Sequence, residues 1–245
     1  MDCESVKPYT DDNRPKGSQV EEMFDNIAPA YDFMNRAMSF GLHRHWLAKT
    51  LRAIRQAAPD GPWLDLATGT ADVAISLALL RPDVDITGID LSEGMLAIGR
   101  RKVKAAGLDR RISLIKADCL ELPFDDDSFD AVTVAYGVRN FEHLDRGLRE
   151  INRVLRPGGM LAVIELSTPQ SPFIRPLYRL YTRTLIPLAG RLKSHDVRAY
   201  SYLPESIAAV PQRSDMTSLI EQAGFRDARY RQMTFGTCTL YTAFK

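Results

Sequence analysis

Three aspartates each close a short apolar run in the first half of the chain: Asp65 in WLDLATGTAD, Asp90 in DITGIDLSEGM and Asp118 in ISLIKADCLELPF. If these runs are parallel strands of one doubly wound sheet, the three carboxylates lie at its carboxyl edge, where such sheets bind ligands. A row of negative charges there repels phosphate and attracts a cation. S-adenosylmethionine carries a sulfonium and an ammonium, offers a ribose diol and has no phosphate. The three residues therefore favour a site for this methyl donor.

The loop after the first run, DLATGTAD, has small residues that let the backbone approach a ligand closely. It contains one glycine, Gly69, whereas a dinucleotide site would have the pattern G-x-G-x-x-G. We expect Asp90 to accept both ribose hydroxyls and Asp118 to accept from the adenine amino group. Each feature alone has a structural alternative: a tight turn for the loop, a strand-end or capping residue for Asp90, and a turn residue for Asp118. Their recurrence in register with the strands favours one shared site.

Composition restricts the class of protein. At 245 residues the chain suits one large α/β domain, and its net charge of +1 provides no field for nucleic acid. Cys3, Cys119 and Cys238 match neither a disulfide framework nor a zinc pattern, so no metal site is expected and the cysteines suit a reducing cytosol. The charged residues 1–17 do not resemble a signal peptide and are expected to be a mobile tail. No apolar run approaches the ~20 residues of a spanning helix, so a cytoplasmic protein is expected.

Residues 18–245 are predicted to form a single domain. A helix should begin near Ser18, which has capping-box spacing to Glu21, and extend to about residue 41 with a break near Pro29. A second helix should follow over 43–57, so that N-terminal helices occupy 18–60. Strands are predicted over 62–67, 84–89, 112–117, 130–135 and 159–166, and helices over 71–81, 93–106 and 144–155. A long insert over 168–212 comes next, then a helix over 215–223 and two strands over 226–234 and 237–244. Together these elements predict a seven-stranded doubly wound sheet with its last strand antiparallel.

The chain resembles the ubiquinone/menaquinone biosynthesis C-methyltransferases over nearly everything after residue 17. The resemblance rests on VEEMFDNIAPAYDFMNRAMSFGLHRHW, LDLATGTAD, GIDLSEGMLAIGRRK, LPFDDDSFDAVTVAYGVRN, RVLRPGG, ELSTP, YSYLPESI and LIEQAGF. It implies a class I S-adenosylmethionine-dependent methyltransferase fold and a polyprenylated hydroquinone substrate, a naphthoquinol or else a benzoquinol. It also implies cofactor contacts from Thr70, Asp90, Asp118 and Cys119, beside Asp65 and Gly69. Ala71 stands where the family usually has glycine, which should be tolerated if the backbone there is not left-handed.

Methylation of a ring carbon needs an electron-rich ring, such as a hydroquinone that has lost a hydroxyl proton. A phenol has a pKa of roughly 10, so a base or a positive neighbour must help. The candidates around the ring are Tyr31, His43, Arg139 and Asn140. His43 has a side-chain pKa near neutrality, although a helix-cap role is an equal alternative. Arg139, at the end of the fourth strand, could stabilise the phenolate, or it could pair with an acid such as Glu142.

The insert over 168–212 is expected to be a substrate lid. Arg175, Arg179 and Arg183 are spaced by four residues, so they share one face of a helix whose other residues are largely apolar. Such a helix is typical of a membrane surface, and a packed lid helix is the alternative. Peripheral contact with the inner face of the cytoplasmic membrane would give access to a polyprenylated substrate. A homodimer is left open, as are a methyltransferase acting on another small molecule and a non-catalytic scaffold that binds the cofactor.

Overall fold

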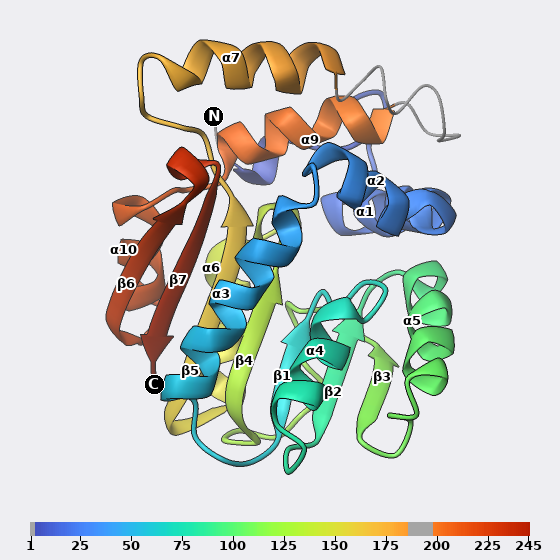
Figure 1. Ribbon diagram of the computed structural model, residues 1–245, viewed down its shortest axis with the longest axis vertical. Coiled ribbons are helices and arrows are strands. Elements are labelled where there is room, and N and C mark those ends of the chain that lie inside the picture. The colour runs from blue at the N-terminus through green and yellow to red at the C-terminus, as the bar shows by residue number, and fades with distance from the viewer. Residues whose placement is uncertain (1–2, 186–197) are drawn as a thin grey trace.

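The structure, a computed structural model, describes residues 3–185 and 198–245. Its centre is a seven-stranded sheet in the order β3-β2-β1-β4-β5-β7-β6, with helices on both faces (Figure 1). The strands are β1 (Trp63–Leu66), β2 (Ile86–Asp90), β3 (Ile112–Lys116), β4 (Phe129–Ala135), β5 (Leu155–Leu166), β6 (Arg226–Met233) and β7 (Cys238–Phe244). The first five run parallel, and β7 pairs antiparallel with both β5 and β6. The predicted sheet, with its antiparallel last strand, is confirmed.

The helices and turns follow the predicted order. The helices are α1 (Lys16–Ile27), α2 (Tyr31–Met38), α3 (Leu42–Ala57), α4 (Asp72–Leu80), α5 (Glu93–Ala105), α6 (Leu144–Val154), α7 (Ile174–Leu180), α9 (Arg198–Ala209) and α10 (Ser214–Gln222). Short turns are η1 (Cys3–Ser5), η2 (Ala28–Ala30), η3 (Val138–Asn140), the π-helical η4 (Tyr181–Leu185) and η5 (Thr234–Gly236). Every strand and helix predicted between residues 62 and 244 is present, with ends displaced by a few residues.

The order of the strands locates the site. From β1 the chain proceeds to β2 and β3 on one side, and from β4 to β5 on the other, so the direction of winding reverses between β1 and β4. Connections that leave neighbouring strands in opposite directions open a crevice at the carboxyl edge, which is where open α/β sheets bind ligands. All four residues of β1 are buried because helices cover both faces of the sheet. A rigid centre therefore carries the loops that surround the crevice.

The start of α1 differs from the prediction. The helix begins at Lys16, after Pro15, with no side-chain cap, so the proposed capping box of Ser18 and Glu21 is wrong. The carboxylate of Glu142 instead accepts from the N–H groups of Lys16 (3.2 Å) and Gly17 (3.0 Å). An acid distant in sequence thus satisfies first-turn amides that a local cap would otherwise serve. The predicted break is confirmed, because α1 ends at Ile27 and η2 carries the proline before α2 begins.

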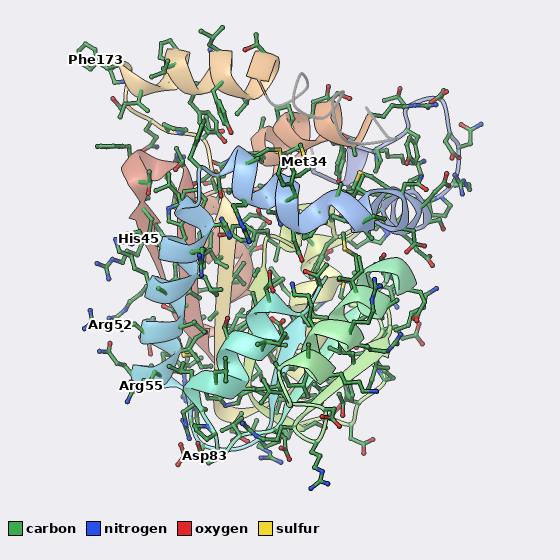
Figure 2. All side chains as sticks on the ribbon, turned by 45° about the vertical axis from the view of Figure 1, so that its right-hand side comes forward. Met34, His45, Arg52, Arg55, Asp83 and Phe173 are labelled. Atoms are coloured by element: carbon green, nitrogen blue, oxygen red, sulfur yellow. The ribbon has the colours of Figure 1, made fainter. Side chains whose placement is uncertain are left out.

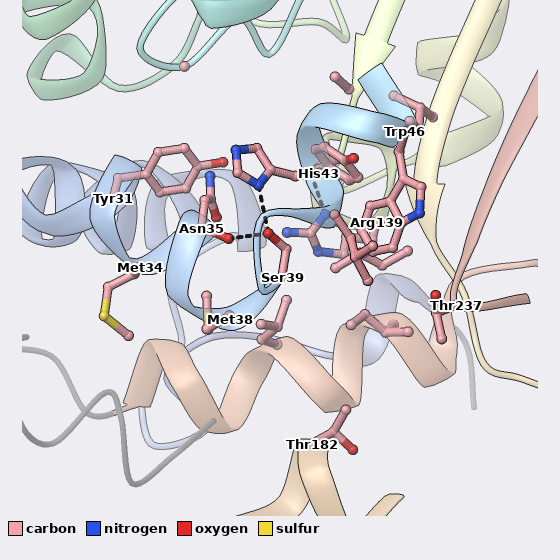
Figure 3. Close-up of a pocket in the computed structure, with 18 of the residues that line it drawn as sticks. Tyr31, Met34, Asn35, Met38, Ser39, His43, Trp46, Arg139, Thr182 and Thr237 are labelled. Carbon is pink, nitrogen blue, oxygen red and sulfur yellow. Dashed lines mark hydrogen bonds between the residues drawn. The ribbon is translucent and has the colours of Figure 1, made fainter. Parts of the chain in front are cut away.

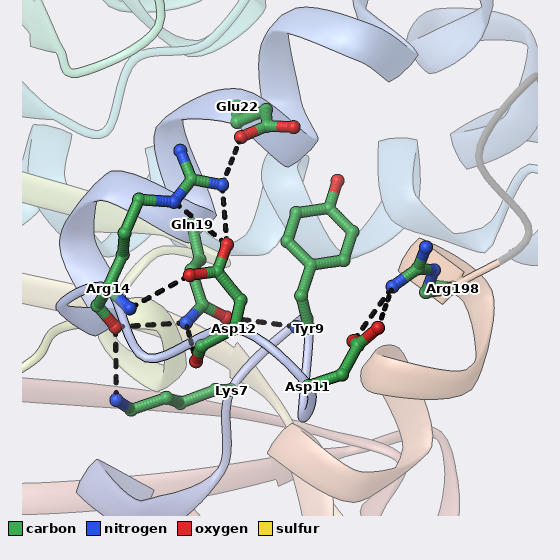
Figure 4. A network of polar contacts seen from close by, with 8 residues as sticks. All are labelled: Lys7, Tyr9, Asp11, Asp12, Arg14, Gln19, Glu22 and Arg198. Carbon is green, nitrogen blue, oxygen red and sulfur yellow. Dashed lines mark hydrogen bonds and ion pairs between the residues drawn. The ribbon is translucent and has the colours of Figure 1, made fainter.

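The segment before α1 packs against the domain. Val6 and Tyr9 are buried, and the Gln19 carboxamide accepts from the Tyr9 N–H (3.0 Å). Figure 4 shows this network, in which Asp12 pairs with Arg14 (2.6 Å). The mobility expected for residues 1–17 stays a prediction, and this packing favours an ordered segment from Val6 onwards.

The insert lies over the carboxyl edge of the sheet, where α7 and α9 form a layer above the strand ends (Figure 1). The Tyr181 hydroxyl donates to the backbone carbonyl of Met38, which ties η4 to α2. Within residues 3–185 and 198–245, no helix is both long and apolar enough to cross a membrane. The basic residues Arg191 and Lys193 of the insert lie outside the described residues.

Candidate active site

A first cavity lies at the carboxyl ends of β1, β2 and β4. Among the described residues that line it, four carry carboxylates (Glu21, Asp90, Asp118 and Glu142) and none is Lys, Arg or His. Such a lining suits a cation and disfavours a phosphate. Apolar side chains such as Met95, Leu120 and Phe141 form the rest of its walls. This donor set fits S-adenosylmethionine, which combines positive charge with an adenosine and lacks phosphate.

Asp90 ends β2 at the centre of this cavity. Its carboxylate accepts from the Gly69 N–H (2.8 Å) and the Ser92 N–H (2.9 Å), which fix its orientation and leave further lone pairs for a ligand. Burial raises the pKa of Asp90 to about 6, against the lowering effect of the two amides. Gly69 itself is left-handed (φ 56°), which brings its N–H toward β2. Ser92 caps α5 by accepting from the Met95 N–H (3.0 Å), as predicted.

Asp118 and Cys119 line the same cavity beyond β3. The Asp118 carboxylate accepts from the Leu120 N–H (2.9 Å), so the turn that follows β3 is held by this side chain. Burial raises the pKa of the Cys119 thiol well above its usual value, which keeps it neutral. Contact of these two residues with the cofactor stays a prediction.

Asp65 and Thr70 are placed differently from the other predicted cofactor residues. Neither is among the described residues that line the first cavity. Asp65 is buried and accepts from the hydroxyls of Thr68 (2.6 Å) and Thr133 (2.6 Å), so it shapes the loop from below. The Thr70 hydroxyl donates to Asp32 (2.6 Å) of α2, which ties the loop to the N-terminal helices. Direct cofactor contact by these two residues stays a prediction.

Alanine in place of glycine at position 71 was expected to be tolerated if the backbone there is not left-handed, and this condition is not met. The backbone of Ala71 is left-handed (φ 65°, ψ 18°), a conformation that disfavours a Cβ. The residue is also fully buried, and a Cβ added at Gly99 of α5 would lie 3.2 Å from its methyl group. The loop therefore carries backbone strain that a glycine would relieve.

A second, larger cavity of about 550 Å³ extends from the first toward the insert. The two cavities share the wall residues Tyr31, Ala67, Gly69, Tyr136 and Asn140, so they are contiguous. The remaining lining is largely apolar and comes from α1, α2, α3, the ends of β4 and β5, and the insert. The lid prediction for 168–212 gains support because α7, η4 and α9 all contribute to this lining.

Arg139 is buried in the wall of the larger cavity. Its guanidinium pairs with the buried Glu165 of β5 (Nη1–Oε1, 2.8 Å) and also donates to the backbone carbonyl of Tyr136. Its Nε has no hydrogen-bond partner, but this atom is buried and does not present a donor to the cavity. The acid that pairs with Arg139 is Glu165, whereas Glu142 is occupied with the start of α1.

Asn140 lines the same cavity, as do Tyr31 and His43 (Figure 3). The Asn140 side chain accepts from the Tyr202 hydroxyl of α9 (3.2 Å), which connects the β4 loop to the lid. Burial raises the pKa of Tyr31, so it remains a neutral phenol. Burial also lowers the pKa of His43, which favours the neutral imidazole. The structure thus gathers all four predicted ring residues around one space.

Several residues of this site were not predicted. Glu165, Tyr202 and Ser39 lie in segments that the sequence assigned to a strand, the lid and a helix end. Lys16 is fully buried, and its ammonium donates to the backbone carbonyls of Arg139 (3.0 Å) and Phe141 (3.1 Å). No pattern in the sequence marks these contacts because they join segments far apart in the chain. Among the described residues there is no group of three His, Cys, Asp or Glu that could hold a metal ion.

The sheet order, the acidic cavity at the switch point and the contiguous apolar cavity define a class I S-adenosylmethionine-dependent methyltransferase. A solved S-adenosylmethionine-dependent methyltransferase from Thermotoga maritima has this fold, with a TM-score of 0.64, 20% sequence identity and coverage of 91% of this chain and 99% of its own. The model of the ubiE/COQ5 methyltransferase family matches residues 11–245. The chain belongs to this family.

Two relatives are similar to this chain over nearly their whole length. A demethylmenaquinone methyltransferase from Bacteroides fragilis is 47% identical over 243 residues, which cover 99% of this chain and 98% of the relative. A ubiquinone/menaquinone biosynthesis C-methyltransferase UbiE from Geobacter sulfurreducens is 42% identical, with coverage of 100% of this chain and 95% of the relative. The family resemblance expected from the sequence motifs is confirmed.

Proposed function

We propose that the protein transfers a methyl group from S-adenosylmethionine to a ring carbon of a polyprenylated hydroquinone, demethylmenaquinol, in menaquinone biosynthesis. The observation that carries this proposal is the apolar cavity of about 550 Å³ that shares a wall with the acidic cavity. A flat, largely apolar ring with two oxygens suits a wall that offers few polar groups. The similarity to the Bacteroides fragilis demethylmenaquinone methyltransferase supports a naphthoquinol. A polyprenyl benzoquinol is the second candidate, because the Geobacter sulfurreducens relative is named for both quinones.

The residues of the first cavity would bind the cofactor. Asp90 would accept from the ribose hydroxyls, Asp118 and Cys119 would contact the adenine, and Gly69 would let the loop approach the ligand. When bound, the sulfonium supplies an electrophilic methyl group. Alignment of that methyl group with the ring carbon is the main requirement of an in-line displacement. The shared wall of Tyr31, Ala67 and Tyr136 would hold the ring against the cofactor.

The residues of the larger cavity would prepare the ring. A hydroxyl proton must leave so that the oxygen pushes electron density into the ring. Arg139 would stabilise the resulting phenolate by its positive charge, and Asn140 would position the ring. The ion pair with Glu165 holds the guanidinium in place. Because a guanidinium is always protonated, it cannot accept the ring proton, and a separate group must take it. His43, neutral and facing the cavity, is the base that the geometry favours.

We further propose that the lid contacts a lipid surface. Phe173 (89% exposed) does not line the larger cavity and lies in the lid close to the basic residues Arg175 and Arg179, which are also exposed. Leu177 (68% exposed) is exposed too, but it also lines the cavity. Figure 2 shows Phe173 projecting outward at the end of the lid. Exposed apolar groups beside cations are typical of a membrane-surface helix, and each buried methylene gains about 0.8 kcal/mol. The side chain of Arg183 lies outside the described residues, and a homodimer stays a prediction.

The test of the function is turnover with a panel of substrates. We expect methylation of reduced demethylmenaquinol analogues, a slower reaction with benzoquinols and none with the oxidised quinones. Arg139→Ala should lower the rate and leave cofactor affinity nearly intact; a melting curve must show that the variant is folded. A single turnover with labelled cofactor that transfers no methyl group to any quinol would support the scaffold alternative instead.

A further inference from the structure

Ser39 and His43 form a hydrogen-bonded pair in the larger cavity. Ser39 ends the turn after α2, and its Oγ lies 2.7 Å from the backbone carbonyl oxygen of Asn35. The same Oγ lies 2.6 Å from Nδ1 of His43, which is in the first turn of α3. Figure 3 shows both contacts and the other ring nitrogen of His43 turned away from Ser39.

The available hydrogens decide the direction of both bonds. A carbonyl oxygen carries no hydrogen, so a contact of 2.7 Å between it and a hydroxyl oxygen requires the hydroxyl hydrogen between them. The single hydrogen of Ser39 is therefore directed to Asn35. The contact of 2.6 Å between Oγ and Nδ1 then requires a hydrogen on Nδ1, because no other hydrogen is available there. Nδ1 donates, and Ser39 accepts.

This direction determines which nitrogen of His43 can act as a base. A neutral imidazole has one N–H, so a hydrogen on Nδ1 leaves a lone pair on Nε2. We propose that Ser39 is a positioning residue that holds neutral His43 as the Nδ1–H tautomer, so that Nε2 takes the proton from a ring hydroxyl of the quinol. The inference rests on the proposed function for the identity of the substrate, but the tautomer itself does not.

The proton step is balanced by the residues described. The O–H bond of the ring hydroxyl breaks, a bond forms between that hydrogen and Nε2, and the electron pair remains on the ring oxygen. His43 becomes an imidazolium whose Nδ1–H still donates to Ser39, so neither hydrogen bond has to rearrange. After methyl transfer the C–H bond at the methylated carbon breaks, which restores the aromatic ring, and the ring oxygen regains a hydrogen. The proton that Nε2 releases to water is then the one proton that the overall reaction liberates.

The surroundings of the His43 imidazole favour its neutral form. Burial has the largest effect and lowers its pKa below 6.5. Arg44 of its own helix and Arg36 of α2 lower it further, while Asp72 of α4 and Asp32 of α2 oppose them. The rate of methyl transfer should therefore be constant above this pKa and fall as pH drops through it, because the protonated imidazole has no lone pair.

The direct test is nitrogen-15 NMR of histidine-labelled wild-type protein with the His43→Gln variant for assignment. The expected spectrum has a hydrogen on Nδ1 of His43 and none on Nε2 at neutral pH. A hydrogen on Nε2 would overturn the proposal. This measurement needs no substrate, so a wild-type protein with the expected tautomer and no quinol methylation would refute the proposed function alone.

The kinetic test uses two substitutions at one position. Ser39→Ala should lower kcat roughly 10- to 100-fold with little change in KM, because general-base catalysis contributes about 10²–10⁴-fold and the variant no longer selects the tautomer. Ser39→Thr keeps the hydroxyl and should restore most of the rate. Equal losses in both variants, or an unchanged kcat in Ser39→Ala, would rule out the positioning role. Melting curves and cofactor titrations of both variants show whether a loss comes from the fold.

Discussion

The buried pair of Arg139 and Glu165 allows a quantitative prediction. Their side chains are 8% and 2% exposed, and Nη1 and Oε1 are 2.8 Å apart. Two unit charges at about 4 Å and an effective dielectric constant of about 20 attract each other by about 4 kcal/mol. Removal of one partner from a buried pair costs about 3–5 kcal/mol, because the remaining charge is left without compensation. Glu165→Gln keeps the shape of the side chain, removes its charge and replaces one of the two oxygens that accept from the N–H groups of Arg139 and Leu166. We therefore expect a loss of this size in the free energy of unfolding.

A double-mutant cycle separates the pair from the site that it supports. Arg139→Met alone should also destabilise, whereas the double variant Arg139→Met with Glu165→Gln should recover most of the loss, because no buried charge then remains. Urea unfolding can be followed by the fluorescence of the buried Trp46 and Trp63. Cofactor affinity should survive in all three variants, since Glu165 does not line the acidic cavity and Arg139 lines only the larger one. A loss below about 1 kcal/mol for Glu165→Gln would refute the reasoning and mean that water reaches the guanidinium.

Three further changes test other parts of the site. Asp90→Ala should weaken cofactor binding in calorimetric titrations by ~1.5–3 kcal/mol, and an unchanged affinity of this variant would exclude a ribose contact. The cofactor affinity of the wild type should also fall as pH drops through about 6, where the Asp90 carboxylate becomes protonated. Burial raises the pKa of Asp65 from 3.8 to about 6, so its protonated form stabilises the fold at low pH; this contribution, roughly 3 kcal/mol, is lost as pH rises from 3.8 to about 6. The free energy of unfolding of Asp65→Asn should therefore decline less with pH over this interval than that of the wild type. Equal declines in the two proteins would contradict the raised pKa. Phe173→Ser should reduce sedimentation with anionic vesicles and turnover of a long-tailed quinol while sparing a short-tailed one. Leu79→Ser, at an exposed position on α4, should change neither; equal losses on both substrates would indicate a folding role.

The parallel core could be predicted because its signals are local. Continuous apolar runs such as the one around Leu64 mark buried strands, and Ser92 marks a helix start by its own capping contact. Asp90 could be placed at the end of its strand for the same reason, whereas Asp65 lies buried within β1 and does not line the cofactor cavity. Asp90 therefore lines the cofactor cavity as expected.

The remainder of the site depends on contacts between distant segments. Glu142 caps α1 from more than a hundred residues away, so the local capping box at Ser18 had no role. Glu165 pairs with Arg139 because β5 lies beside β4, which only the sheet order reveals. The left-handed backbone of Ala71 is likewise set by the loop around the cofactor cavity, against the preference of its side chain. Sequence patterns indicate which residues could act, whereas tertiary packing decides their partners.

The buried Lys16 connects the behaviour of the two cavities. Its ammonium holds the turn of Arg139 and Phe141, while Glu142 of the same segment holds the first amides of α1. The helix that walls the cofactor cavity and the turn that walls the ring cavity are therefore joined by these contacts. A ligand that orders them reduces the entropy that the other ligand must still overcome, and linkage makes the effect reciprocal. The cofactor and the quinol should thus each increase the affinity for the other, in addition to any effect of their direct contact.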